Sequence, residues 1–196
     1  MTFRLAVPLA LLAALSGCVA PVGPVEVTRF HAVDITPLGK GTISIEAGPG
    51  MDAGSLELQA YQAAVNQQLQ RLGFTTAASG AGNQVALVRV SRNRYRPDRA
   101  HGPVSVGVGG SAGSYGSGVG LGIGIDLSGK SPEQVETQLS VTIRDRKSGA
   151  ALWEGRASFT ISANSPMADT SLGAAKLAEA LFKGFPGTSG ETIEVK

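Results

Sequence analysis

Five arginines lie close together near the middle of the chain, in the stretch Arg89–Arg99 (RVSRNRYRPDR). They are Arg89, Arg92, Arg94, Arg96 and Arg99, and they surround Tyr95. A guanidinium group forms bidentate contacts with phosphate and carboxylate oxygens, so the stretch is a candidate patch for anionic lipid headgroups or lipopolysaccharide phosphates. The simpler interpretation is a solvated strand end that leads into a loop, since runs of charge usually mark solvated surfaces.

Residues able to support catalysis or to hold a metal are sparse. A serine or cysteine nucleophile needs a positioned base, and the only histidines are His31 and His101. The sequence contains no G-x-S-x-G elbow, no H-E-x-x-H motif and no zinc-type Cys/His spacing. Its acidic residues are scattered rather than arranged as a calcium loop. We therefore expect no catalytic residues, no metal site and no cofactor.

The glycine-rich stretch Val104–Leu127 (VSVGVGGSAGSYGSGVGLGIGIDL) carries no charge until Asp126. A dinucleotide loop would need a helix directly after the glycines, but more glycines follow, and each costs about 1 kcal/mol in a helix. The lysine of a phosphate-binding loop is also missing. A membrane helix is the stronger alternative, because Gly116, Gly120 and Gly124 have the small-xxx-small spacing of close helix pairs.

Alternation within this stretch favours a third structure, a β-hairpin. Aliphatic residues occupy the odd positions from Val119 to Leu127, and the even ones hold three glycines and Asp126. The same period of two begins at Val104. The sequence thus predicts two strands with a bend within Gly109–Gly118. Because one face would be almost bare backbone, we expect self-association or docking on an envelope protein partner. The alternative is an insertion tolerant of sequence change.

The N-terminus has the layout of an export signal. Arg4 precedes the apolar stretch Leu5–Leu15, which is too short to cross a hydrocarbon core of about 30 Å. Leu15-Ser16-Gly17-Cys18 resembles the lipobox of bacterial lipoproteins, and Cys18 is the only cysteine in the chain. We expect residues 1–17 to be a signal peptide and Cys18 to be lipidated. Residues 18–24 would then form a lipidated tether.

The expected mature chain is balanced in charge. Removing residues 1–17 from the 196 leaves 179, enough for a single domain. Loss of Arg4 leaves 16 basic against 15 acidic residues, which gives no electrostatic reason to expect nucleic-acid binding. With no second cysteine, no intramolecular disulfide can form. Packing must therefore provide the stability.

Hydrophobic periodicity predicts strands and two helices within residues 25–196, with residues 102–129 as the glycine-rich insertion. The strands are expected at Val25–Val33, Thr42–Ile45, Gln84–Val90, Gln138–Arg144 and Leu152–Ser162, and Thr192–Val195 is a candidate edge strand. In the strand at 152–162, Trp153 shares a face with Phe159 and Ile161, which indicates core packing rather than ligand stacking.

The first predicted helix has signals at both ends. Ser55 is a plausible N-cap, Gly73 a left-handed C-cap, and Phe74 could fold back on the last turn. Its apolar face is expected to consist of Leu58, Tyr61, Val65, Leu69 and Leu72. The second helix is expected at Ala168–Lys183, with Leu172, Ala175, Leu177, Ala178 and Leu181 against the sheet. The predicted fold is α+β: an antiparallel or mixed sheet of about five strands with two helices packed on one face, plus a Gly-rich β-hairpin.

Four sequence blocks in order resemble a known family. They are VTRFH (Val27–His31), GSLELQAY (Gly54–Tyr61), LWEGR (Leu152–Arg156) and LFKGFPGTSGETIEV (Leu181–Val195). Over nearly the whole mature chain the sequence is similar to Gram-negative envelope lipoproteins with domain of unknown function 4136. The resemblance implies an α+β fold and an envelope lipoprotein with no established activity, and it supplies no catalytic residues. The insertion in many relatives is rich in aromatic residues, whereas Tyr115 stands alone here.

Together these observations predict a lipoprotein held by its lipid at the inner leaflet of the outer membrane and facing the periplasm. Val19 rather than aspartate follows the cysteine, which favours the outer membrane by the enterobacterial sorting rule. The expected role is structural or protein-interacting. A carrier for a small apolar ligand or lipid, held between the sheet and its helices, is the alternative, and an enzyme comes third.

Overall fold

The structure, a computed structural model, describes residues 23–97, 104–113, 116–125 and 131–196, with only the backbone described for 104–113 and 116–125. Its elements are β1 (Val25–His31), β2 (Thr42–Ala47), α2 (Leu56–Arg71), β3 (Thr75–Thr76), β4 (Gln84–Tyr95), β5 (Val104–Gly113), β6 (Gly116–Ile125), β7 (Gln134–Asp145), β8 (Ala151–Ser162), the 3₁₀ turn η2 (Pro166–Ala168), α3 (Thr170–Phe182) and β9 (Thr192–Val195).

The main sheet is mixed and has seven strands, in the order β3-β2-β4-β7-β8-β1-β9. β2 runs parallel to β3 and β4, and the other neighbours are antiparallel. The predicted α+β class with two helices is confirmed, but the expected number of about five strands is too low. β3 has only two residues, Thr75 and Thr76, and so short a strand leaves no periodicity to detect.

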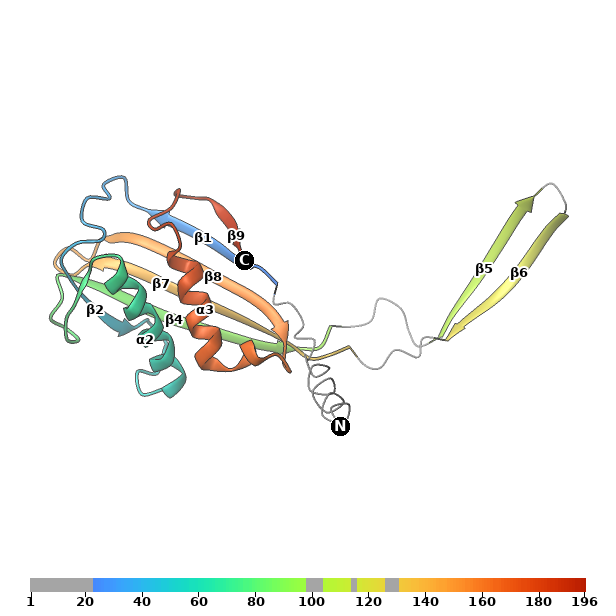
Figure 1. The fold of residues 1–196 in the computed structure, drawn as a ribbon, viewed down its shortest axis with the longest axis horizontal. Helices are drawn as coiled ribbons and strands as arrows, with labels where there is room; N and C mark the ends of the chain where they lie inside the picture. The colour runs from blue at the N-terminus through green and yellow to red at the C-terminus, as the bar shows by residue number, and fades with distance from the viewer. Residues whose placement is uncertain (1–22, 98–103, 114–115, 126–130) are drawn as a thin grey trace, which may run out of the picture.

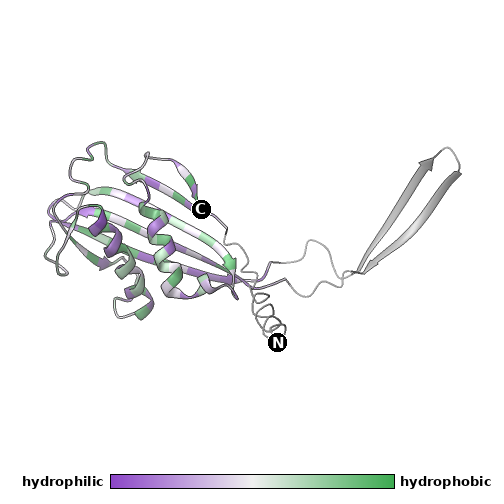
Figure 2. Cartoon of the chain, in the orientation of Figure 1, coloured by the Kyte–Doolittle hydropathy of each residue, from purple (hydrophilic) through white to green (hydrophobic). Residues whose placement is uncertain are grey.

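Both helices cover the same face of the sheet (Figure 1). The strands show why, because buried and solvent-facing residues alternate along β7 and β8. Figure 2 shows the same alternation as hydropathy along the ribbon. Leu139, Val141 and Ile143 of β7 are fully buried or nearly so beneath the helices. The opposite surface of the sheet, which we call the open face, carries the polar residues of the same strands.

Helix α2 begins and ends as its cap residues predict. The Ser55 hydroxyl accepts a hydrogen bond from the Leu58 N–H, which satisfies one of the free donors at the helix start. At the other end Gly73 has φ = 99°, and the Phe74 N–H donates to the Leu69 carbonyl at 3.1 Å. This pattern is a Schellman motif, which requires a residue that tolerates positive φ. The predicted buried face of α2 is confirmed for Leu58, Tyr61, Val65 and Leu69.

Helix α3 is shorter than predicted, and its predicted buried face is confirmed at Leu177, Ala178 and Leu181 but differs nearer its start. Asp169 caps it at Thr170, so Ala168 belongs to the preceding turn η2 and Lys183 lies beyond the end. The prediction that Leu172 and Ala175 face the sheet is wrong, because both are exposed. Gly173 and Ala174 are buried instead, because Gly173 lies against the Met167 carbonyl and the Phe159 ring. Close packing of these two small residues therefore determines which side of α3 is buried near its start.

Trp153 forms the centre of an aromatic cluster under α3, as its phase in β8 predicts. The side chain is fully buried and stacks on Phe182 with ring centroids 5.3 Å apart. Phe185 lies against the same indole at 5.2 Å, and the indole Nε1–H donates to the Pro186 carbonyl at 3.0 Å. A buried indole needs such an acceptor, so this bond fixes the segment that follows α3 onto the sheet.

Arg29 is a buried charged residue on the helix-covered face of β1. Its guanidinium donates to the carbonyls of Leu181 at 3.0 Å and Ala180 at 3.1 Å. These carbonyls lie in the last turn of α3, where free acceptors and the negative end of the helix dipole favour a cation. Burial lowers the pKa of Arg29, and nearby Glu191 opposes that shift. Arg29 therefore ties the end of α3 to β1.

Strands β5 and β6 form a separate two-stranded antiparallel sheet. Its register sets Val106 opposite Ile123 and Gly107 opposite Gly122. Pairing extends to Gly113 and Gly116. Residues 114 and 115 lie outside the described part of the chain. This sheet is inserted between β4 and β7, which pair directly with each other at Tyr95 and Gln134.

Candidate binding groove on the open sheet face

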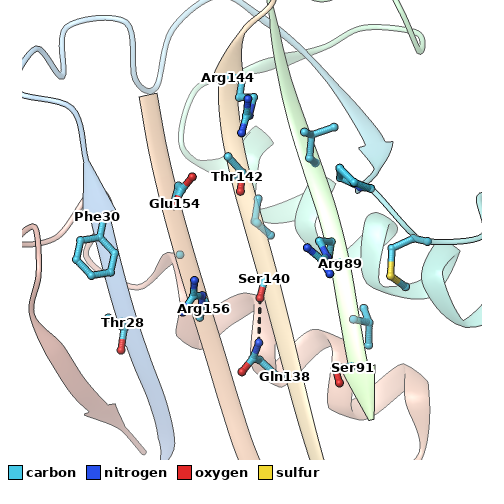
Figure 3. Close-up of a pocket in the computed structure, with 16 residues that line it drawn as sticks. Thr28, Phe30, Arg89, Ser91, Gln138, Ser140, Thr142, Arg144, Glu154 and Arg156 are labelled. Carbon is cyan, nitrogen blue, oxygen red and sulfur yellow. Dashed lines mark hydrogen bonds between the residues drawn. The ribbon is translucent and has the colours of Figure 1, made fainter. Parts of the chain in front are cut away.

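Four neighbouring strands bring two arginines into one row on the open face. The registers align Arg89 of β4, Ser140 of β7, Arg156 of β8 and Thr28 of β1. Figure 3 shows Arg89 and Arg156 on either side of the strand that carries Ser140. Neighbouring strands are about 4.8 Å apart, so the two arginine backbones are separated by about 10 Å. The row therefore presents two guanidinium groups with a hydroxyl between them.

A second row lies next to the first and has a different chemistry. Leu87 of β4, Thr142 of β7, Glu154 of β8 and Phe30 of β1 are aligned by the same registers. The Phe30 ring is 49% exposed although it is large and apolar. Glu154 places one carboxylate beside the two arginines of the first row. The open face thus combines hydroxyl groups with charges of both signs and an exposed aromatic ring.

These rows form the floor of a groove of about 550 Å³. Phe30 lines it at β1 (Figure 3). Pro49 and Met51 also line it, and they belong to the segment after β2, which is hydrogen-bonded to β4 at Gly48. Within the groove, the Gln138 side-chain amide donates to the Ser140 hydroxyl at 3.2 Å. The groove therefore has a floor that mixes charged, hydroxyl and apolar groups, with further apolar residues at its two borders.

The Arg89 side chain passes directly over Gly48, in space that a larger residue would occupy. A Cβ atom at Gly48 would collide with Cγ of Arg89 and would lie 3.1 Å from the Val88 carbonyl oxygen. Gly48 also donates its N–H to that carbonyl at 2.8 Å, which holds the loop against β4. A larger residue at position 48 would therefore displace the Arg89 side chain from its present course.

The positive charge of the groove is not neutralised by ion pairs within the described residues. Among these residues the salt bridges are Arg92–Glu57 at 2.9 Å and Arg146–Glu46. Arg89, Arg144 and Arg156, which all line the groove, form no ion pair with any carboxylate described in the structure. Glu154 is the acidic residue among the lining, so the groove carries a net charge of +2 from these four groups.

The ion pair at Glu46 lies on the open face next to the groove. The Glu46 carboxylate accepts hydrogen bonds from the Gly80 N–H, from Arg146 and from the Ser44 hydroxyl. Partial burial would raise the pKa of Glu46, but these donors outweigh it and lower the pKa below 4.5. Arg146 also donates to the Gly82 carbonyl at 2.9 Å. This cluster fixes the hairpin after β7 against β2.

The predicted patch of five arginines is divided between the two faces of β4. Arg89 lies on the open face, whereas Arg92 points to the helices and bonds to Glu57, to the Thr170 hydroxyl and to the Ala168 carbonyl. Arg94 is two residues after Arg92 and therefore on the same face of β4, where it is exposed. Arg96 is also exposed and lies just after the end of β4. Arg99 lies outside the described residues. Side chains alternate along a strand, so Arg89 and Arg92, three residues apart, lie on opposite faces and cannot belong to one patch.

Of the other candidate residues, only His31 is described by the structure, and it does not line the groove. Cys18, the signal peptide, most of the tether and His101 lie outside the described residues. The His31 ring has its Nδ1 within 2.8 Å of the neighbouring Ala32 carbonyl oxygen. In the described ranges, no cluster of three or more His, Cys, Asp or Glu residues has metal-binding geometry, and no helix is long and apolar enough to span a bilayer.

Arg144, Arg156 and Ser140 have no motif in the sequence that marks them as site residues. Alternation in β8 does place Glu154 and Arg156 on the solvent-facing side of that strand. Their proximity to Arg89 depends on the strand order β4-β7-β8-β1, which no local pattern specifies. The groove is a product of topology rather than of a motif.

The structure thus defines an α+β domain with helices on one face of a mixed sheet and a basic groove on the other. A family model described as Domain of unknown function (DUF4136) matches residues 45–187. The chain therefore belongs to this family. An uncharacterized protein from Zymomonas mobilis subsp. mobilis is 31% identical over 215 aligned positions, which cover 88% of this chain and 80% of the relative.

A solved structure shares the fold at low sequence identity. It is a PDZ domain protein from Parabacteroides distasonis, with a TM-score of 0.51 and 12% identity. The match covers 88% of this chain but only 39% of the other protein, so the chain corresponds to less than half of that structure. The likeness supports the arrangement of helices and strands.

Proposed function

We propose that this protein is a lipid-anchored protein of the outer membrane, facing the periplasm, whose α+β domain binds a protein partner through its open face. One observation carries the proposal. Two helices cover only one face of the main sheet, while the other face holds a groove with three arginines that have no ion-pair partner among the described residues. Cationic, unpaired groups on a concave surface favour recognition of a complementary partner. We assign no catalytic role.

Packing between the helices and the sheet favours this role over a carrier of apolar ligands. Trp153, Leu139, Leu177 and Leu181 fill the space where a carrier would hold its ligand, and each is fully buried. A lipid carrier would need an apolar cavity there. The groove lies on the opposite face, and its lining includes three arginines and a glutamate.

The lipid anchor rests on the sequence around Cys18. Attachment of acyl chains at this residue would hold the domain near the outer membrane, since the expected tether is short. Replacement of Cys18 by serine is expected to abolish incorporation of labelled palmitate and to release the protein from the membrane fraction. Retention of label in C18S would contradict the anchor without affecting the groove.

The glycine-rich strands β5 and β6 supply a second proposed contact. From Val106 to Gly109 their register places glycine opposite glycine and aliphatic residue opposite aliphatic residue. A sheet face made of glycine backbone allows another backbone to approach closely, so we assign self-association to this hairpin. This role is separate from the groove, and deletion of the hairpin tests it.

Photo-crosslinking from defined positions tests the function of the open face. A benzophenone amino acid at Ser91, which lines the groove, is expected to give a discrete adduct with a protein partner in intact cells. The same amino acid at Gln67, an exposed position on α2, is the matched control. Absence of any adduct from Ser91, or equal products from both positions, would contradict the proposal.

A further inference from the structure

We infer that the groove binds an extended acidic segment of a protein partner, with carboxylates seated on Arg89 and Arg156 and an apolar side chain against Phe30. This inference rests on the proposed function and adds the chemistry of the partner. Its first support is electrostatic. Three arginines and one glutamate line the groove, and the arginines form no salt bridge to the carboxylates that the structure describes. A guanidinium presents paired donors that match a carboxylate.

The spacing of the arginines fits two separate carboxylates better than one compact anion. Arg89 and Arg156 lie on the two strands that flank β7, with Ser140 between them (Figure 3). Their backbones are about 10 Å apart, and alternate side chains of an extended peptide are about 7 Å apart. Arginine side chains are long enough to bridge the difference of about 3 Å between these two spacings. A single phosphate could contact both groups only if both side chains bent over Ser140.

The size of the groove also fits a short peptide. From Phe30 on β1 to Leu87 on β4 it crosses four strands, which corresponds to about 15 Å, or four to five extended residues. Its apolar borders, Phe30 at one side and Met51 at the other, suit aliphatic side chains next to the carboxylates. A planar lipid surface fits poorly into a concave groove that has raised borders, so a membrane is the less favoured occupant.

Glu154 supplies a specific prediction about binding strength. It lies in the row next to the arginines, where its carboxylate repels an acidic ligand. Glu154→Gln removes this repulsion and leaves the shape of the groove unchanged. The substitution should therefore strengthen binding of an acidic peptide. Since misfolding weakens binding, a gain of affinity identifies the charge effect directly.

Fluorescence anisotropy of the full-length lipoprotein in detergent tests the inference. The probe is a labelled peptide of alternating glutamate and serine that ends in leucine, and the control peptide carries glutamine for glutamate. We expect R89S/R156S to weaken binding of the glutamate peptide at least about fivefold and E154Q to strengthen it about twofold. R71S/K183S removes the same charge from exposed positions outside the groove and should leave affinity unchanged.

Three results would overturn the inference: no binding of the glutamate peptide up to about 1 mM, equal binding of the glutamine peptide, or equal effects of the two double substitutions. Binding to anionic phospholipid vesicles that is lost in R89S/R156S, without peptide binding, would assign the arginines to a membrane instead. If Ser91 crosslinks a partner in cells equally well in wild type and R89S/R156S, the open-face function stands and the acidic segment does not.

Discussion

At the scale of single residues, Arg29 shows how a buried charge can serve the fold rather than the groove. It lies on the helix-covered side of β1 and satisfies two carbonyls at the end of α3. Arg29→Met keeps an apolar stem but leaves both carbonyls without their donors. We expect a loss of about 3 kcal/mol in the free energy of unfolding, measured by urea denaturation.

Arg156→Met is the matched control for this prediction. Arg156 is exposed and sits on the neighbouring strand, so its substitution should change the unfolding free energy by no more than about 0.5 kcal/mol. Equal losses in the two variants would show that Arg29 does not stabilise α3 through these carbonyls.

Glu46 makes the stability of the fold depend on pH. Its pKa is lower in the folded protein than its ordinary value of 4.5, so the unfolded chain binds the proton more tightly. The carboxylate therefore stabilises the fold above that value, and the contribution is lost as pH falls through the folded-state pKa. Glu46→Gln should cost about 1 kcal/mol near pH 7, since the group is partly exposed.

The measurement compares urea midpoints of wild type and E46Q at about pH 7 and about pH 3. We expect the gap between the two proteins to narrow at the lower pH. A gap of constant size would mean that the variant removes packing rather than a titrating charge.

At the scale of elements, Gly155 lets β8 and α3 pack on either side of Trp153. A Cβ atom at this position would collide with the end of the indole and lie 2.8 Å from Leu181 Cδ1. Gly155→Ala should therefore lower the free energy of unfolding by about 2 kcal/mol through overpacking. The fluorescence of Trp153, the single tryptophan in the chain, reports this transition.

Ser158→Ala provides the comparison for this glycine. Ser158 belongs to the same strand but lies on the open face, so its substitution should change stability by less than about 0.5 kcal/mol. If G155A were as stable as S158A, the indole would not be held as tightly as the structure indicates.

The same scale shows what the sequence could and could not predict. The ends of α2 follow from Ser55 and Gly73, because capping depends on residues adjacent in the chain. The buried phase of β8 follows from simple alternation. The face of α3 was mispredicted at Leu172, because the contact of Gly173 with Met167 and Phe159 outweighs the burial of one leucine. These contacts depend on how η2 and β8 pack against the start of α3, which hydrophobic periodicity does not report.

The candidate site was less predictable than the fold for the same reason. Arg89 belongs to a visible basic run, but the run divides between two faces, and Arg92 serves the helices instead. Arg156 joins Arg89 only because β7 lies between their strands. Predicting the groove would require the strand order, which depends on the pairing of segments far apart in the chain.

At the scale of the whole molecule, the glycine-rich insertion should be separable from the main domain. β5 and β6 share no hydrogen-bonded ladder with the seven-stranded sheet, and β4 pairs with β7 up to Tyr95 and Gln134. Deletion of residues 98–130 would join Pro97 to Ser131 and leave a short hairpin loop. Since a shorter loop costs less closure entropy, stability should be unchanged or raised by up to about 2 kcal/mol.

Light scattering of the deletion variant then tests the role of the hairpin. If β5 and β6 mediate self-association, the full chain in detergent should form larger particles than the deletion variant. Equal sizes would remove that role, whereas failure of the variant to fold would show that the insertion supports the main domain.

The central claim is that the open face of the sheet is the binding surface, and that its arginines hold the partner. The most direct measurement is the yield of the crosslinked adduct from a benzophenone at Ser91 in intact cells, compared between wild type and R89E/R156E. We predict a discrete adduct in wild type that the charge reversal abolishes, while Gln67 gives none in either protein. An adduct of equal yield after charge reversal, or its absence from Ser91 in wild type, would contradict the account.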